Sequence, residues 1–369
     1  MLSTDTEIKN ERHDQEGASP KGPLVSVMVV VRNGAGDISG VLDSIRQQDY
    51  RPLEVLIVDG MSDDGTRALV EQQIANDPDF SIRLLDNPGR IQATGWNVGI
   101  RAARGNYVLR IDAVHCRLQP NYIHCCLEKL LELQHGDPSV AATGGRRLSV
   151  DRAETAWSKA IAAAQSCRFG VGGAAYRLDT EPGFKDTLGV PLYDRKILFQ
   201  VGLFDESLGR SEDNYLHAQM RWQGFKLYFI PDVVAIYHPR TTLPGLASQM
   251  FHNGWWVSAT ILRKRSFPFG TRHLIPFAFY VILTVLAGFS VGGFFAAKIL
   301  LGGLLGCYFL GSLVAAFQAF PAMSFWRVAF IFWLMHFCYA TGTAAGIFAR
   351  RSEGAATGTI TAPGAHSGS

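Results

Sequence analysis

Two adjacent acidic residues, Glu212 and Asp213, offer a group that can remove a proton. They lie in the stretch SEDNYLHAQMRWQG, directly after a serine. Transfer of a group to a hydroxyl needs one carboxylate to take the hydroxyl proton as the oxygen attacks, which is general-base catalysis. A structural explanation is also open, because Ser211 could cap a helix and the helix dipole favours acids in a first turn. The pair is a candidate catalytic site, with helix capping as the alternative.

Two further acids close predicted strands. Asp59 ends the run PLEVLIVD, and Asp112 ends the run NYVLRID. Ligands of doubly wound sheets bind at the carboxyl ends of the strands, so both side chains are candidates for contacting a ligand. The residues GMSDDG follow Asp59 and are typical of a tight turn, so turn formation is the alternative for this acid.

A histidine lies near each of two strand ends. His115 follows Asp112 after an alanine and a valine, and His238 follows the predicted strand LYFIPDVVAIY. Neutral imidazole is a ligand for Mn²⁺ as well as for softer ions. A lone histidine is more often structural, so packing is the alternative to metal binding at His238.

The elements that carry these residues alternate between strands and helices. The run LVSVMVVVRN at 24–33 is almost continuously β-branched, as in a strand buried on both faces of a parallel sheet. Further strands are predicted at 52–59, 81–87 and 106–113, and helices at 38–48, from Thr66 onward and at 91–105. This alternation predicts a doubly wound, mostly parallel α/β sheet.

Charge and cysteine content exclude some classes of function. The 35 Lys and Arg residues are spread among 32 acidic residues, with a net charge of +3 and no dense basic stripe, so nucleic acid is not expected as a partner. The six cysteines show no CxxC spacing. We therefore expect reduced thiols and no structural zinc.

The C-terminal part is apolar enough for membrane helices. Between Leu274 and Phe320 the only charge is Lys298, and residues 328–349 carry none. Apolar runs of about 18 residues or more are typical of membrane helices. About three spans are predicted within 274–349, at 274–295, 299–318 and 328–348.

Basic residues before the first span predict the orientation. The cluster RKR at 263–265 and Arg272 place residues 1–273 in the cytoplasm by the positive-inside rule. The protein is thus expected to be a multi-pass protein of the inner (plasma) membrane. Three spans would place Arg350 and Arg351 on the opposite side, which conflicts with the same rule.

Three further segments lie outside the predicted sheet and membrane helices. Residues 241–273 contain Trp255 and Trp256 and have a basic end, which predicts an interfacial amphipathic helix with aromatic anchors. The polar stretch 1–23 and the low-complexity tail 350–369 are predicted to be disordered.

Several ordered motifs resemble the family 2 inverting glycosyltransferases. They are VSVMVVVRN, VDGMSDDGT, TGWNVGIRAARGNYVLRIDA and VGLFDESLGRSEDNYLHAQMRWQG. The stretches FGVGGAAYR and YHPRTTL are similar to the membrane-anchored exopolysaccharide branch of that family. The resemblance extends roughly over residues 24–260 and implies a GT-A nucleotide-sugar-binding domain at 24–240, followed by transmembrane helices.

The resemblance also implies roles for particular residues. Asp213 matches the position of the catalytic base, and Glu212 would orient it or the acceptor. The residues implied in donor binding are Arg32, Asn33 and Asp59 for the uridine, Arg90 and Asn97 for the diphosphate and sugar, Asp112 for the diphosphate, and Arg221 as support.

A divalent metal, Mn²⁺ or Mg²⁺, is implied to neutralise the departing diphosphate. In the family the metal motif is Asp-x-Asp or, in the exopolysaccharide branch, Asp-Ala-His. Here the second ligand position holds Val114, which cannot bind a metal. Either an extra residue loops out so that His115 reaches the ion, or Asp112 acts with the diphosphate and His238.

The function implied is transfer of one sugar from a nucleotide-sugar donor, UDP-linked by resemblance, to a lipid-linked saccharide in surface or exopolysaccharide biosynthesis. A processive polysaccharide synthase and a polyprenyl-phosphate glycosyltransferase are alternatives. The Gln-x-x-Arg-Trp motif of processive members is absent, which counts against the first. A catalytically silent membrane scaffold is a third alternative, and the intact SED sequence counts against it.

Overall fold

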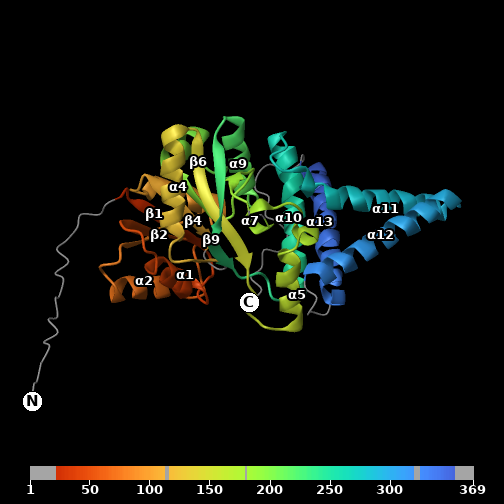
Figure 1. Ribbon diagram of the computed structural model, residues 1–369, viewed down its shortest axis with the longest axis horizontal. Helices are drawn as coiled ribbons and strands as arrows, with labels where there is room; N and C mark the ends of the chain where they lie inside the picture. Colours follow the sequence, from red (N-terminus) through yellow and green to blue (C-terminus); the bar gives the residue numbers. More distant parts are fainter. Residues whose placement is uncertain (1–21, 113–115, 179–180, 320–324, 354–369) are drawn as a thin grey trace, which may run out of the picture.

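A computed structural model describes residues 22–112, 116–178, 181–319 and 325–353. It has two parts that lie side by side: a sheet covered by helices, and a group of long helices from the C-terminal part of the chain (Figure 1). The mostly parallel sheet and its alternating helices are those of the GT-A fold.

The sheet contains nine strands in the order β3-β2-β1-β4-β8-β6-β9-β5, with β7 also paired to β9. The strands are β1 (Val25–Val31), β2 (Leu53–Asp59), β3 (Ile82–Asp86), β4 (Tyr107–Asp112), β5 (Cys116–Leu118), β6 (Val140–Ser149), β7 (Gly183–Phe184), β8 (Pro191–Asp194) and β9 (Lys226–Tyr237). Strands β1 to β4 are mutually parallel where they pair, and β8 is antiparallel to both β4 and β6. The first four strands confirm the predicted parallel strands, and β1 is buried along its whole length as expected.

The register of the parallel strands brings their carboxyl ends together. Val31 lies beside Asp59, and Val30 lies beside Asp112. The residues that follow β1, β2 and β4 therefore share one edge of the sheet, as the sequence pattern predicts.

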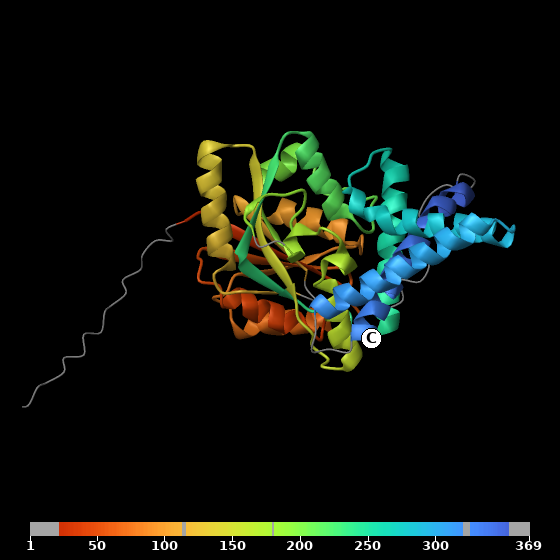
Figure 2. The ribbon, with the colours of Figure 1, turned by 45° about the vertical axis from the view of Figure 1, so that its right-hand side comes forward.

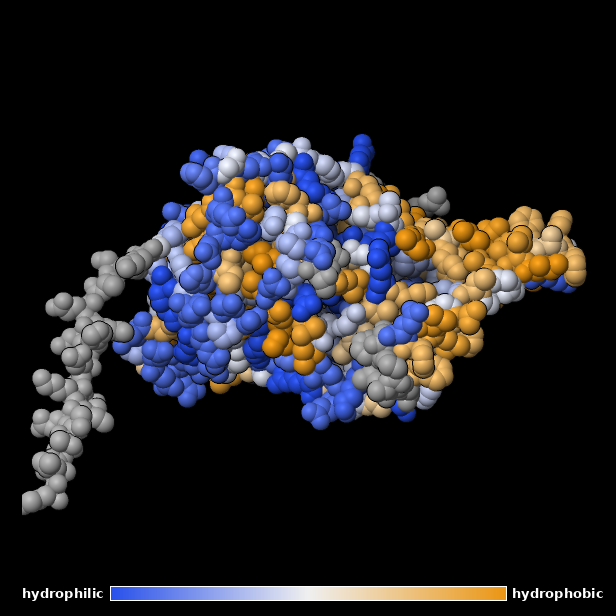
Figure 3. Space-filling view, viewed as in Figure 1, coloured by the Kyte–Doolittle hydropathy of each residue, from blue (hydrophilic) through white to orange (hydrophobic). Residues whose placement is uncertain are grey.

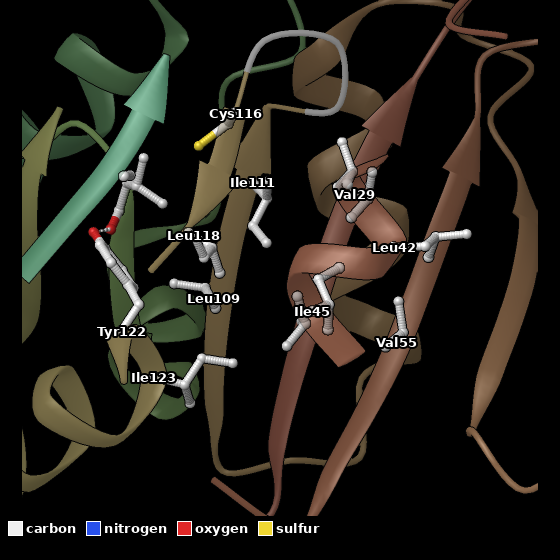
Figure 4. Packing of buried hydrophobic residues seen from close by; sticks show 14 of the residues in the cluster. Val29, Leu42, Ile45, Val55, Leu109, Ile111, Cys116, Leu118, Tyr122 and Ile123 are labelled. Atoms are coloured by element: carbon white, nitrogen blue, oxygen red, sulfur yellow. Dashed lines mark hydrogen bonds between the residues drawn. The ribbon is translucent and has the colours of Figure 1, made fainter. Parts of the chain in front are cut away.

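Helices cover both faces of the sheet. They are α1 (Ile38–Arg46), α2 (Thr66–Asn76), α3 (Gln92–Ala102), α4 (Tyr122–Gly136), α8 (Arg195–Val201) and α9 (Glu212–Trp222). One face packs its valine and isoleucine side chains against α1 and α4, as Figure 4 shows around Leu42, Ile45 and Ile123. The other face packs against α3, α8 and α9. The core is thus formed on both sides of the sheet, which accounts for the uninterrupted apolar strands.

The remaining helices form the C-terminal part and its contact with the sheet. They are α5 (Ala156–Gln165), α6 (Arg168–Val171), α7 (Ala175–Leu178), α10 (Leu243–Lys264), the 3₁₀ turn η1 (Thr271–His273), α11 (Ile275–Val291), α12 (Phe295–Ala319) and α13 (Phe325–Glu353). Helix α13 packs on α10 and on α5.

Helices α10 and α13 run in the same direction at close range. Gly254 faces Tyr339, and one turn later the Ser258 hydroxyl donates to the Thr343 carbonyl at 2.8 Å. A Cβ atom on Gly254 would collide with the Tyr339 carbonyl oxygen, and one on Gly342 would collide with the chain of α10. Small residues therefore allow the two backbones to approach, as in membrane helix pairs.

Helices α11 and α12 form a hairpin that projects from the rest of the molecule (Figure 2). The face of the hairpin seen in Figure 3 is mostly hydrophobic, and Val291 and Phe295 at its turn are strongly exposed. Residues Phe295–Gln318 and Phe325–Phe348 are long and apolar enough to cross a membrane, with 11% and 44% of their most apolar windows buried in the protein.

Two expectations about this part need correction. The first predicted span corresponds to α11, which has 17 residues and is shorter than a usual span. The expected aromatic anchors, Trp255 and Trp256, are buried against Leu208 and Ala259. Both indoles lie inside the protein because α13 and the sheet part enclose this section of α10, so they do not face lipid headgroups.

Candidate active site

The predicted catalytic pair begins helix α9. Glu212 and Asp213 occupy its first turn, where the helix dipole favours negative charge. The expected cap by Ser211 is wrong: Ser211 has a left-handed backbone (φ 64°) and its side chain makes no capping hydrogen bond. The helix dipole and the neighbouring Asn214 therefore stabilise these acids locally, and a further partner comes from elsewhere in the chain.

Arg110 contacts both Glu212 and Asp213, and the sequence analysis did not select it as a site residue. It lies in β4, its side chain is buried, and its Nη2 donates to Glu212 Oε1 at 3.3 Å. Its Nη1 lies 3.7 Å from Asp213 Oδ2. The guanidinium also stacks over the rings of Trp96 at 4.9 Å and Phe204 at 5.8 Å, which holds it in one orientation.

The two acids differ in their access to solvent. The side chain of Asp213 is 31% exposed, whereas that of Glu212 is 4% exposed. Asp213 Oδ1 accepts hydrogen bonds from the backbone and side-chain amides of Asn214 at 2.7 and 3.0 Å. Burial raises the pKa of Asp213, but Arg110 and the other neighbours outweigh it and lower the pKa below its ordinary value. Asp213 is thus an accessible carboxylate that is ionised at neutral pH.

A buried histidine lies one turn further along α9. His217 Nδ1 lies 2.8 Å from Thr187 Oγ1, and its Nε2 lies 2.7 Å from the hydroxyl of Tyr193. Burial is the largest cause that lowers the pKa of His217, to about 3. The imidazole is therefore neutral near pH 7. Its two hydrogen bonds connect α9 to Thr187 and to Tyr193 of β8, so its role is structural and it does not exchange protons.

Asp59 ends β2 and is buried in the turn that follows it. Its Oδ1 accepts from the Ser62 hydroxyl at 2.6 Å, and both carboxylate oxygens lie 3.3 Å from the Ser62 backbone nitrogen. Arg67 Nη1 lies 3.9 Å from Oδ2. These contacts give direct support to the turn explanation. A contact between Asp59 and the base of a nucleotide stays a prediction.

Three other residues expected around the donor lie in two places, at the edge of the sheet near Asp59 and in the turn before α3. Asn33, with a left-handed backbone (φ 54°), joins the turn after β2 by accepting from the Asp63 backbone amide at 3.1 Å. Arg32 is exposed at the same edge of the sheet. Arg90 is also exposed, with φ 59°, in the turn before α3. Asn33 and Arg32 therefore share an edge with Asp59, as predicted.

Two of the expected donor residues have structural partners instead. Asn97 is buried, and its amide donates to the Phe204 carbonyl at 2.8 Å and to Glu206 Oε1 at 2.7 Å, while its Oδ1 accepts from the Phe204 amide at 2.9 Å. Asn97 thus connects α3 to the chain before α9, and the structure disfavours a direct donor contact. Arg221 lies two turns beyond Asp213 and contacts Asp186 through its guanidinium, so the two predicted site residues are not brought together.

The expected metal ligands are only partly described. The backbone of Asp112 ends β4, but its side chain, together with Val114 and His115, lies outside the described residues. His238 Nδ1 lies 3.1 Å from the Val150 carbonyl, to which it can only donate, so Nε2 carries the lone pair that a metal would use. Within the described ranges, no three His, Cys, Asp or Glu side chains gather as a metal site. Metal binding stays a prediction, and the His238 tautomer is compatible with it.

A sequence signal for Arg110 does exist. It is a charged residue in the otherwise apolar strand that ends in Asp112. A buried arginine requires an anionic partner. The pattern therefore predicts that some acid must reach this strand, but it does not identify Glu212 and Asp213 as the acids that do so.

The comparisons with known proteins agree with this architecture. Residues 26–183 match the model of the glycosyl transferase family 2. Residues 26–183 are a family 2 glycosyltransferase domain. The protein is an enzyme of the glycosyltransferase class, so the silent-scaffold alternative is not supported.

Two relatives resemble most of this glycosyltransferase. The succinoglycan biosynthesis protein ExoA of Rhizobium meliloti is 29% identical over 259 residues, which are 68% of this chain and 74% of ExoA. A dolichyl N-acetyl-α-D-glucosaminyl phosphate 3-β-D-2,3-diacetamido-2,3-dideoxy-β-D-glucuronosyltransferase of Methanococcus voltae is 24% identical over 273 residues, 71% of this chain and 81% of the relative. This glycosyltransferase is thus related to enzymes of glycan biosynthesis.

A solved structure shows the same fold over most of its length. It is the mannosyltransferase PcManGT of Pyrobaculum calidifontis, in complex with GDP-Man and Mn²⁺. The two proteins share 21% identity with a TM-score of 0.59, and the match covers 90% of each chain. At this identity the likeness bears on the fold.

Proposed function

We propose that this glycosyltransferase moves one sugar from a nucleoside-diphosphate donor, UDP-linked in our reading, to a lipid-linked saccharide in surface or exopolysaccharide assembly. The observation that carries the proposal is the position of Asp213. It is a solvent-accessible carboxylate with a lowered pKa, held against a buried arginine at the start of a helix. Such a group can accept a proton from an acceptor hydroxyl.

The proposed mechanism assigns separate tasks to the three charged residues. The acceptor oxygen attacks the anomeric carbon on the face opposite the diphosphate, and Asp213 takes the hydroxyl proton as the new bond forms. The anomeric configuration is inverted because the bond to the diphosphate breaks on the other face. Arg110 holds the Asp213 carboxylate in place, and Glu212 holds Arg110 at 3.3 Å. Glu212 is too buried to reach an acceptor itself.

The donor site is proposed at the shared edge of β1, β2 and β4. Arg32, Asn33 and Asp59 lie there, next to the end of β4. A divalent cation, Mn²⁺ or Mg²⁺, held by Asp112 with His238 or His115, would stabilise the negative charge of the departing diphosphate. PcManGT holds GDP-Man with Mn²⁺, so the identity of the nucleotide needs its own test.

The lipid-linked acceptor is supported by two observations. The Methanococcus voltae relative is named for a dolichyl phosphate-linked sugar acceptor. The hairpin of α11 and α12 exposes an apolar surface that a bilayer would cover. An enzyme held at the membrane meets a lipid acceptor at raised effective concentration.

The hairpin also suggests a different membrane topology from three spans. We propose that α11 and α12 enter the inner membrane and return, and that α13 stays with the cytoplasmic part through its contacts with α10 and α5. Arg350 and Arg351 then stay on the cytoplasmic side, in accord with the positive-inside rule. A green fluorescent protein fused after Ser369 should fluoresce in cells. A dark, exported fusion would favour three spans.

The proposed reaction is tested by the variant Asp213→Asn with membranes and lipid extract. Transfer should fall by about 10²- to 10⁴-fold, because the amide cannot accept the proton. Donor binding should be unchanged, and Asp232→Asn on the exposed side of β9 serves as the matched control. Normal transfer by Asp213→Asn would exclude it as the base.

A donor panel completes the test. UDP-glucose, UDP-galactose, UDP-GlcNAc and GDP-mannose are each supplied with and without Mn²⁺ or Mg²⁺. We expect nucleotide release from a UDP-sugar that depends on the lipid and the metal, with one sugar added per acceptor. Long products grown by a single enzyme would favour a processive polysaccharide synthase. Transfer to a polyprenyl phosphate that carries no sugar would favour a polyprenyl-phosphate glycosyltransferase.

A further inference from the structure

A pocket of about 480 Å³ lies between the sheet part and the C-terminal helices. Its walls come from α5 to α7 on one side and from α10 to α13 on the other, with Asn214 of α9 also lining it. Asn214 is the residue that hydrogen-bonds the proposed base, Asp213. The volume is within the range of small-molecule sites, and the position is directly beside the candidate active site.

Three buried polar atoms in the lining have no hydrogen-bond partner within the described part of the chain. They are Gln165 Nε2, Gln249 Oε1 and His273 Nε2. Gln165 as a residue is only 2% exposed. Buried polar atoms without a partner are costly and uncommon, so three around one cavity indicate that a polar group of a ligand belongs there.

The charge of the lining defines the kind of polar group. Arg168, Arg177 and Arg272 line the pocket, and none of the described residues that line it is acidic. Neither do these arginines form an ion pair with an acidic side chain that the structure describes. An anion with several oxygens suits such a set, because arginines bind phosphate oxygens through paired donors.

The opposite wall is apolar. Phe279 of α11 and Tyr308 of α12 stack with ring centroids 4.9 Å apart, and Met335 of α13 lies beside them in the lining. Phe279 and Tyr308 belong to the two helices that we propose to enter the bilayer, whereas Met335 belongs to α13, which stays with the cytoplasmic part. An apolar chain that leaves the pocket along this wall would pass directly into lipid.

We propose that this pocket binds the phosphate and the first apolar segment of the lipid-linked acceptor. The phosphate lies among Arg168, Arg177 and Arg272, the lipid chain follows Phe279 and Tyr308, and the saccharide extends past Asn214 to Asp213. This inference rests on the proposed function, and it adds the residues that recognise the lipid carrier.

The test uses the full chain in detergent and measures equilibrium binding of farnesyl diphosphate, with inorganic diphosphate and farnesol as separate probes. Farnesyl diphosphate should bind at least about tenfold more tightly than either probe, since each lacks one half of the ligand. Equal binding of inorganic diphosphate would mean that the arginines hold a free or nucleotide diphosphate, and would overturn the proposal.

Two variants locate the binding to this pocket. Arg272→Gln should weaken farnesyl diphosphate by about tenfold or more, and Arg265→Gln, which is exposed outside the pocket, should not. Gln165→Leu should weaken binding because it removes the unpartnered Nε2, and it should lower the melting temperature slightly because Gln165 Oε1 accepts from Arg177 Nη1 at 3.3 Å. Unchanged affinity in both pocket variants would overturn the inference.

The outcome separates this inference from the proposed function. Equilibrium binding of the nucleotide-sugar donor is measured in parallel for each variant and should be unchanged. If farnesyl diphosphate binds in the pocket but no lipid accepts a sugar, the lipid site stands and the proposed reaction fails. If lipid-linked transfer occurs and the pocket variants transfer as well as the native enzyme, the reaction stands and this site is wrong.

Discussion

The acids at the start of α9 and the acid at the end of β2 are stabilised in different ways. Asp59 is held by Ser62, three positions along the chain, and by the nearby Arg67. Glu212 is held by Arg110, 102 positions away, and Asp213 shares the same arginine. The first arrangement is a turn that a short peptide sequence encodes. The second exists only when β4 and α9 are packed together.

The difference bears on function. Turn formation alone can explain an acid such as Asp59, so its position at a ligand-binding edge is weak evidence that it binds a ligand. A buried arginine is expensive unless its partners are in place, and such charge clusters with shifted pKa values mark functional sites. The α9 site is therefore the stronger candidate for chemistry, and the β2 end is the candidate for recognition.

Removal of the arginine should have the largest effect. Arg110→Met removes the hydrogen bond that the buried Glu212 accepts from Arg110, and we expect a loss of about 3–5 kcal/mol of folding stability together with loss of transfer. Thermal unfolding in detergent and lipid-linked transfer measure the two effects. Arg110→Lys keeps the charge and should be intermediate. Arg46, on α1, has a side chain that is 23% exposed and serves as the control. If Arg110→Met were as stable as Arg46→Met, the contact of Arg110 with the two acids would contribute nothing to stability.

The second-largest effect is expected for Asn97, which connects α3 to the chain before α9. Asn97→Ala removes three hydrogen bonds to Phe204 and Glu206 and leaves backbone groups unpaired, which should cost about 2 kcal/mol. The KM for the donor should stay nearly constant, because the amide is occupied within the protein. Asn76→Ala, at the exposed end of α2, is the control. A large rise in donor KM with full stability would restore Asn97 to the donor site.

The buried histidine gives the stability of the α9 site a pH dependence. The pKa of His217 is lowered to about 3, whereas an unfolded histidine titrates near 6.5. The unfolded state therefore binds more protons as pH falls below about 6.5, and stability declines from there toward pH 3. At pH 5 the loss should be about 2 kcal/mol. His217→Gln should flatten the melting temperature between pH 5 and 6.5. If the melting temperature of His217→Gln fell with pH as steeply as that of the native protein, another group would be responsible for the pH dependence.

The smallest effect is expected at the β2 end. Asp59→Asn can still accept the Ser62 hydroxyl through its amide oxygen, so stability should hardly change. The KM for a UDP-sugar should rise about tenfold if the carboxylate contacts the uracil. The KM ratio between UDP- and GDP-sugars is the measurement, with Asp63→Asn in the same turn as control. An unchanged ratio would leave Asp59 with its turn role alone.

Sequence patterns were sufficient for much of the fold. The β-branched runs that end at Asp59 and Asp112 predict strands whose carboxyl ends meet, and the register confirms it. This works because local propensity and hydrophobic periodicity act over a few residues. The apolar C-terminal stretches likewise predict long helices. Whether each of them crosses a membrane could not be predicted, since a partly buried helix such as α13 and a membrane span have similar composition.

The sequence by itself determined the element types, the shared edge of the parallel strands and the acid pair at the start of α9. Only the tertiary structure decided which charges meet. It placed Arg110 against Glu212 and Asp213, turned Asn97 toward Phe204, separated Arg221 from the base and enclosed Trp255 and Trp256. The physical reason is that burial and pairing of a charge depend on side chains about a hundred residues apart, and neither propensity nor spacing carries that information.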